Sequence, residues 1–127
     1  MVRVCYDDLF RFLQELAHPT GKPFTLPGHY SGSATTYQTV LDYEVPADYE
    51  LDVDFITLFS DAWSNTVWKL AIADISHLDG DTFQTSITLT WRNATVRSRQ
   101  RVLLQCKSSS GAIAIDAVLT GNLREVS

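Results

Sequence analysis

The residues that could carry chemistry are few and lie far apart in the chain. His18, His29 and His77 are the only histidines, and each falls in a segment that we expect to be a loop. A metal site needs several converging ligands, and none of the three has a second ligand at helical or hairpin spacing. Asp79 and Asp81 flank a glycine, but a calcium loop needs a longer series of oxygen ligands that ends in an acidic residue. We therefore interpret 79–81 as a turn, and we expect neither a metal nor a cofactor.

The two cysteines, Cys5 and Cys106, have no identifiable histidine that would activate either thiol as a nucleophile. The sequence also lacks a glycine-rich phosphate loop, the nucleophile elbow of hydrolases and the HExxH zinc motif. Together these observations predict a protein that is not an enzyme. We favour two unpaired thiols, with a bridge between them as the alternative. Residues 93–95 match the acceptor pattern for N-glycosylation, but we interpret them as a polar hairpin tip.

Composition excludes several classes of partner. The chain has 127 residues, enough for one domain that buries a core without disulfides or metal. Its formal net charge of −5 argues against nucleic acid or an anionic membrane surface as the main partner. No apolar run approaches the length of a membrane span. The N-terminus, which includes Asp7 and Asp8, lacks the layout of a secretory signal, so we expect synthesis in the cytoplasm.

Alternating apolar and polar residues run from about Tyr37 to Leu119 and predict strands with one buried and one solvated face. Phe55 is followed directly by Ile56, and this break in the alternation indicates either a bulge or a change of the exposed face. Residues 77–81 and 93–98 are rich in turn formers, and we expect turns there. The fold class is therefore all-β, an antiparallel jelly-roll-like sandwich. Six strands are expected, at residues 37–44, 49–59, 66–73, 82–91, 99–107 and 112–121. The addition of one or two strands from the N-terminal region is left open.

The N-terminal part has a different pattern. Residues 6–17 place leucines on one helical face, and Pro19 ends the predicted helix. Residues 18–36 carry three prolines and several glycines, serines and threonines, which predicts a long loop. A loop of this length is unusual in a compact domain and is typical of an arm or a lid. We therefore divide the chain into a helix with an extended arm at 1–36 and a β-sandwich domain at 37–127.

Charged residues gather in two stretches of the predicted sandwich. Asp52 and Asp54 belong to the acidic stretch, and Arg97, Arg99 and Arg101 belong to the basic one. Charges at alternate positions are usually the solvated face of a sheet, and this is the simpler interpretation. The alternative is that the acidic face of one subunit meets the basic strand of a neighbour in a symmetric homo-oligomer.

Three aromatic residues are candidates for contact with a partner. Trp63 lies in the polar loop 60–65, where its ring either folds back onto the sandwich or anchors a partner or a sugar ring. Tyr30 and Tyr37 flank the Ser-Gly-Ser part of the arm, and the same two interpretations apply to them.

The second half of the chain resembles small jelly-roll or β-tulip modules of tailed bacteriophages. The resemblance is carried by YEVPADY at 43–49, WKLAI at 68–72 and AVLTG at 117–121. It covers about two thirds of the chain and contains no active-site motif. Such modules serve as capsid decoration (cement) proteins, head fibres and tail appendages. Decoration proteins of this kind are typically trimers with an N-terminal arm that reaches across the capsid, and the predicted helix departs from that pattern.

The resemblance implies a viral structural protein, a decoration protein that binds the outer capsid surface as an oligomer and stabilises it. The implied partners are the major capsid protein or another virion protein and further copies of this chain, and the implied location is the virion surface. The alternative is a receptor-binding module of a phage tail or fibre, or another carbohydrate-binding sandwich. That function would use Trp63, Tyr30 and nearby polar groups to bind sugars.

Overall fold

The computed structural model describes residues 21–126 and forms eight strands. The helix expected at 6–17 lies outside the described residues. A short 3-10 helix, η1 (Trp63–Asn65), leads from β3 into β4. The strands are β1 (Lys22–Gly32), β2 (Gln38–Glu44), β3 (Tyr49–Ser60), β4 (Thr66–Ile72), β5 (Ile75–Asp81), β6 (Ile87–Val96), β7 (Arg101–Ser108) and β8 (Ile113–Glu125).

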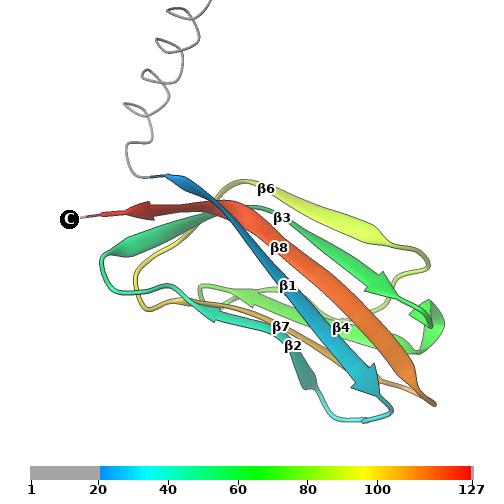
Figure 1. Cartoon of the computed structure of the whole chain (residues 1–127). Coiled ribbons are helices and arrows are strands. Elements are labelled where there is room, and N and C mark those ends of the chain that lie inside the picture. Colours follow the sequence, from blue (N-terminus) through cyan, green and yellow to red (C-terminus); the bar gives the residue numbers. More distant parts are fainter. Residues whose placement is uncertain (1–20, 127) are drawn as a thin grey trace, which may run out of the picture.

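The strands form two four-stranded antiparallel sheets that pack face to face as a sandwich (Figure 1). The strand order is β1-β8-β3-β6 in one sheet and β2-β7-β4-β5 in the other. The first four strands therefore pair with the last four in reverse order: β1 with β8, β2 with β7, β3 with β6 and β4 with β5. This pairing is the topology of an eight-stranded jelly roll, so the expected fold class is confirmed.

The core lies between the two sheets and is built by alternation along each strand. On β3, for example, Leu51, Val53, Ile56 and Leu58 are buried, and the carboxylates between them face outward. The largest fully buried side chain is Trp68 of β4, whose indole N–H has no hydrogen-bond partner among the described residues. The same alternation on β7 and β8 completes a continuous apolar layer.

One flank of the sandwich, formed by β1 and β2, is closed. A Cβ atom on Gly28 of β1 would clash with the carbonyl oxygen of Val40 and with the side chain of Leu41, both on β2. Only glycine permits this close approach between the two sheets. Pro23 and Pro27 lie on β1 itself, which is tolerated because β1 is an edge strand whose other side needs no ladder hydrogen bonds.

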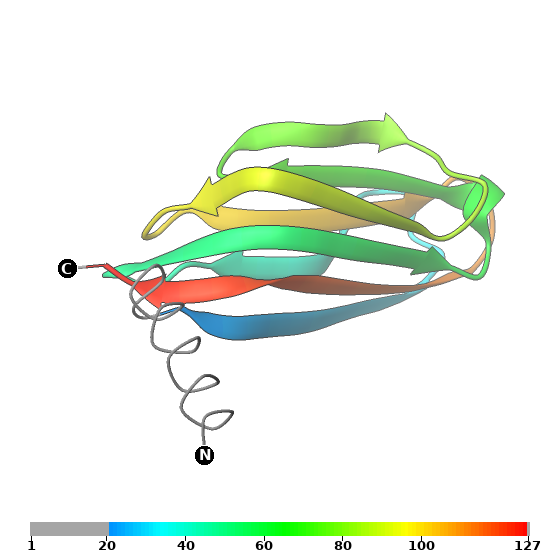
Figure 2. The ribbon, with the colours of Figure 1, turned by 90° about the horizontal axis from the view of Figure 1, so that it is seen from above.

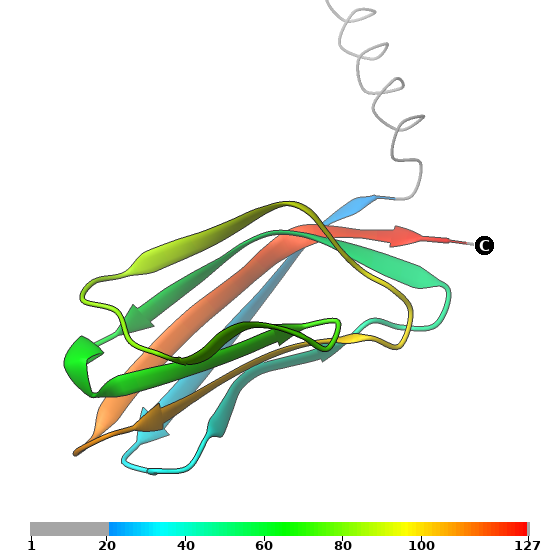
Figure 3. The same cartoon turned by 180° about the vertical axis from the view of Figure 1, so that it is seen from behind.

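The opposite flank, formed by β5 and β6, is open. On β5 only Leu78 is buried, and Ile75 is the most exposed large hydrophobic residue among those described, at 64%. On β6, Ile87 and Leu89 face inward but are only partly buried. Seen from above and from behind, β5 and β6 follow the outer edges of their sheets (Figures 2 and 3). This flank therefore leaves part of the core uncovered.

Two of the predicted segments are wrong in secondary structure. Residues 22–32, expected within a loop-like arm, form β1, which pairs with β8 along its whole length. Residues 77–81, expected as a turn, belong to β5. Both segments are edge strands. Sheet edges tolerate residues that are typical of loops, such as the prolines and glycines of the first segment and the Asp-Gly-Asp of the second.

Further along, the predicted turn at 93–98 is also partly wrong, since β6 continues to Val96 and begins only at Ile87. The other five predicted strands are confirmed with small changes at their ends. The predicted bulge is confirmed too, because the register of β3 shifts between Val53 and Phe55 relative to both of its neighbours. This shift places Ile56 inside, while Phe55 is only partly buried.

Candidate functional site: a polar hollow at the β3 bulge

The bulge in β3 opens a polar hollow on the sheet formed by β1, β8, β3 and β6. Val53 of β3 pairs with Ala94 of β6, and Phe55 pairs with Thr90. Between these two pairs β3 has one residue, Asp54, whereas β6 has three. On the other side, Gly121 of β8 allows the backbone of β3 to come close, because a Cβ there would clash with the carbonyl oxygen of Asp52. Bulges of this kind commonly redirect side chains next to functional sites.

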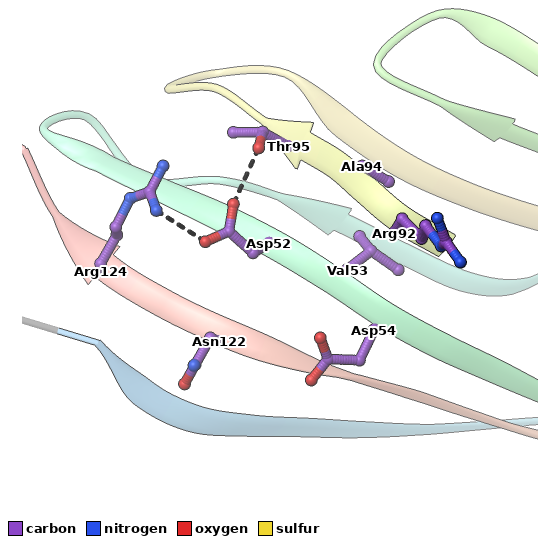
Figure 4. A pocket seen from close by; sticks show the side chains of 8 residues that line it. All are labelled: Asp52, Val53, Asp54, Arg92, Ala94, Thr95, Asn122 and Arg124. Carbon is purple, nitrogen blue, oxygen red and sulfur yellow. Dashed lines mark hydrogen bonds and ion pairs between the residues drawn. The ribbon is translucent and has the colours of Figure 1, made fainter. Parts of the chain in front are cut away.

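The hollow has a volume of about 350 Å³ and takes its lining from three strands (Figure 4). The lining is polar, with two carboxylates, two guanidinium groups, a carboxamide and a hydroxyl above a small apolar floor. The residues are Asp52, Val53, Asp54, Arg92, Ala94, Thr95, Asn122 and Arg124.

One wall of the hollow is held rigid by Arg124. Its guanidinium donates to Glu50 Oε2 at 2.6 Å and to Asp52 Oδ2 at 2.7 Å. The other oxygen of Asp52 accepts a hydrogen bond from Thr95 Oγ1 at 2.8 Å. The hydrogen bond to Glu50, followed by the charge of Asp52, raises the pKa of Arg124 despite its partial burial. Asp52 is therefore committed to contacts within its own subunit.

The other wall carries side chains without such contacts. Asp54 of β3, Arg92 of β6 and Asn122 of β8 form no side-chain hydrogen bond or ion pair with the described residues. Asp54 and Arg92 have opposite charges, yet they stay apart across the hollow. An open polar site with uncommitted donors and acceptors can bind a small ligand.

Three arginines of the predicted basic stretch have different surroundings in the structure. Arg101 of β7 is paired within the chain: it donates to both oxygens of Asp42 at 3.0 and 2.9 Å and lies 3.6 Å from Glu44. Arg97 and Arg99 are exposed in the turn between β6 and β7, and within residues 21–126 neither side chain has an ion pair. One member of each charged stretch, Asp52 and Arg101, is therefore already paired within the chain.

The aromatic candidates lie at separate places. Trp63 packs against the buried Trp68, with ring centroids 6.0 Å apart, and against Phe59 at 6.3 Å. The Tyr30 hydroxyl accepts a hydrogen bond from the backbone N–H of Ala34, across the loop after β1. Both rings therefore contact the sandwich itself, as the simpler of the two interpretations predicts.

Tyr37 lies on the outer side of the other sheet. Its ring contacts two ammonium groups, those of Lys69 at 5.3 Å and Lys107 at 4.6 Å from the ring centroid. The two lysines come from β4 and β7, and of the two only Lys107 was noted from the sequence, as part of the basic stretch. Their approach depends on the pairing of the two strands.

Two further residues of the hollow, Asn122 and Arg124, were not singled out from the sequence, and Arg92 was counted only as part of the basic stretch. The only available signal was the alternation of polar residues at the end of the chain, where Thr120, Asn122 and Arg124 continue the outer face of β8. That pattern predicts exposure, but it does not predict that β3 and β6 supply the rest of the site.

Other kinds of site have less support. Within residues 21–126, no three histidine, cysteine or acidic side chains come together as metal ligands. Cys106 is a free, fully buried thiol, and burial raises its pKa to about 11. At neutral pH it is therefore protonated and a poor nucleophile. None of the helices among the described residues is long and apolar enough to span a membrane.

Comparison with known proteins supports the fold. No known protein family matches this sequence, and no curated protein is significantly similar to it. Among solved structures, the chain is similar to one from the cyanophage Pam1 capsid asymmetric unit, with a TM-score of 0.53. The similarity covers 81% of this chain and 86% of that chain at 14% sequence identity. At this identity the likeness shows that the two chains share a fold.

Proposed function

We propose that this protein is a structural component of a phage virion, and more narrowly a decoration protein that binds the outer capsid surface as an oligomer. The observation that carries the proposal is the jelly-roll topology, shared with a phage capsid chain over most of the length of both chains. The resemblance to decoration modules rests on short sequence motifs at 43–49, 68–72 and 117–121, and it supports the same conclusion. In this role the protein has no enzymatic activity, and its partners are the capsid and further copies of itself.

The open flank is the part of the molecule best suited to meet another subunit. Ile75 is exposed, and Ile87 and Leu89 are only partly covered, so contact with a second copy would finish burying one edge of the core. Asp79 and Asp81 on β5 have no ion pair within the described part of the chain. They offer opposite charge to the unpaired arginines of the β6–β7 turn in a neighbour.

In such a contact the acidic edge of β5 in one copy would face the basic β6–β7 turn of the next. Charge complementarity of this kind fixes the relative orientation of subunits in homo-oligomers. It also modifies the original expectation about the charged stretches. The acidic partner becomes the edge of β5, because Asp52 is already bound to Arg124.

The first test is the oligomeric state of the full chain by light scattering, for which we expect a trimer. Substituting Ile75→Asp should dissociate it, since a charge would be buried at the subunit contact. Phe59→Asp is the matched control: Phe59 is the other exposed large hydrophobic residue, at 48%, and lies on β3 rather than on the open flank. A monomeric wild-type protein, or equal effects of both variants, would contradict the proposed contact.

The second test measures binding to capsids that lack this protein by co-sedimentation. Residues 1–20 can be removed without touching β1, whereas removal of residues 1–36 would also delete the strand that pairs with β8. We expect the shorter deletion to abolish capsid binding and to leave the β-sheet circular dichroism unchanged. Full binding without residues 1–20 would show that the arm is not the capsid anchor.

A further inference from the structure

We propose that the polar hollow at the β3 bulge binds a neutral sugar residue. This site is distinct from the loop aromatics considered in the sequence analysis and from the open flank. Its recognition groups are Asp54, Arg92 and Asn122, one from each of three adjacent strands. All three line the same hollow (Figure 4).

The chemistry of these three groups selects the ligand class. A carboxylate only accepts hydrogen bonds, a guanidinium only donates them, and a carboxamide does both. A ligand that satisfies all three must therefore present donors and acceptors within a short distance of each other. Each hydroxyl of a sugar ring both donates and accepts, so a single ring can meet all three groups. The volume of about 350 Å³ lies within the range of small-ligand sites.

The charge of the hollow selects against ions. Asp54 and Arg92 contribute one negative and one positive charge to the lining, and the charge of Asp52 is paired with that of Arg124. Glu50 is also paired with Arg124, but it does not line the hollow. A small anion would meet the carboxylate of Asp54, and a metal cation would meet the guanidinium of Arg92. A neutral ligand is free of both repulsions, and it can use both side chains as charged hydrogen-bond partners.

The surrounding structure holds the site in place before a ligand arrives. Asp52 is fixed by Thr95 on one side and by Arg124 on the other, and Arg124 is fixed further by Glu50. The small side chain of Ala94 and the bulge itself keep the space above them open. These contacts fix the wall formed by Asp52 and Arg124, so binding would cost little rearrangement on that side of the hollow.

The test is a two-dimensional NMR titration of the full-length protein with glucose, galactose, rhamnose and N-acetylglucosamine in turn. We expect at least one of them to shift the backbone amide signals of residues 52–54, 92–95 and 122–124 in a saturable manner. Asp54→Ala and Arg92→Ala should each weaken that binding by roughly tenfold or more, since each removes a hydrogen bond to a charged group.

Matched controls are Asp116→Ala and Arg101→Ala, which remove the same kinds of side chain from exposed positions outside both the hollow and the proposed subunit contact. They should leave the affinity unchanged. The proposal is overturned if none of the four sugars shifts these signals, if the shifts map to the Trp63 loop instead, or if Asp54→Ala binds as well as the wild type. A titration with glycine, a zwitterion, tests the assignment of the ligand class: saturable shifts with glycine and none with sugars would refute it. These outcomes do not depend on capsid binding or oligomeric state, so they are separable from the proposed function.

Discussion

The two flanks of the sandwich are built from the same alternating pattern, yet they differ in how well they cover the core. At the β1–β2 flank, glycine lets the two sheets meet, and Val40 and Leu41 are buried. At the β5–β6 flank, β5 is exposed except for Leu78. There the two strands are linked by Trp91, whose indole N–H donates to His77 Nδ1 at 3.4 Å. The difference shows that an inward-facing residue is fully buried only where the opposite sheet reaches over it, so we expect it to contribute most to stability there.

The largest expected effect comes from truncating leucines on the two sides of this comparison. Leu58 on β3 is fully buried, and Leu89 on β6 is partly buried on the open flank. Leu58→Ala should lower the free energy of unfolding by about 2–5 kcal/mol, because it leaves a cavity in a packed core. Leu89→Ala should lower it by about 1 kcal/mol, because solvent already reaches the site. Urea unfolding of the monomeric Ile75→Asp background measures both, and equal losses would mean that the open flank is packed as tightly as the core.

The packing of the closed flank is tested by a substitution that adds a methyl group between the two sheets. Gly28→Ala places a methyl group against the Val40 carbonyl oxygen, so the sheets must separate locally. We expect a loss of about 1–3 kcal/mol in the free energy of unfolding, the usual cost of overpacking. Thr90→Ala on the outer face of β6 is a control for which we expect little change, because Thr90 is exposed. If thermal unfolding of Gly28→Ala matched that of the wild type, the flank would be less tightly closed than its geometry indicates.

The smallest expected effects concern two clusters, Arg124 with its partners and Arg101 with its partners. Each arginine contacts two carboxylates, but the two clusters differ in burial. Arg124 and its two carboxylate partners have side chains exposed by 23–30%, whereas Arg101 is exposed by 52% and its partners by 38% and 53%. Arg124→Ala should cost about 1–2 kcal/mol, and Arg101→Ala less than about 1 kcal/mol, since solvent screens the exposed pairs. Added salt should reduce the difference between wild type and Arg101→Ala more than that for Arg124→Ala. Chemical denaturation at low and high salt makes both measurements, and the reverse order would contradict this explanation.

The sequence predicted all four strands that lie inside the sheets, whereas of the four edge strands it predicted β2, missed β1 and β5 and misplaced the bounds of β6. β3, β4, β7 and β8 have neighbours on both sides, and their alternation follows burial closely. β1 and β5 are edge strands, where prolines, glycines and bulges are permitted, so their composition is that of loops. The β4–β5 hairpin also lacks a typical turn signal, since Ala73 and Asp74 adopt positive φ values of 52° and 65° in place of Asn-Gly.

The candidate site was predicted less well than the fold. Asp52 and Asp54 were selected as two members of one acidic stretch, but the structure gives them different roles. Asp52 is bound to Arg124, which lies 72 residues away in the sequence, and Asp54 lines the hollow without a side-chain partner among residues 21–126. Local sequence shows that both carboxylates face solvent, but it contains no information about which distant cation comes near one of them.

The sequence by itself determined the fold class, the bulge near Phe55 and most of the core, because each follows from the order of apolar and polar residues along one strand. Only the tertiary structure decided which strands are edges, which flank is open and which side chains meet in the hollow. These features depend on how strands far apart in the chain pair with one another. The clash that reserves position 121 for glycine, next to the backbone of Asp52, is one such long-range constraint.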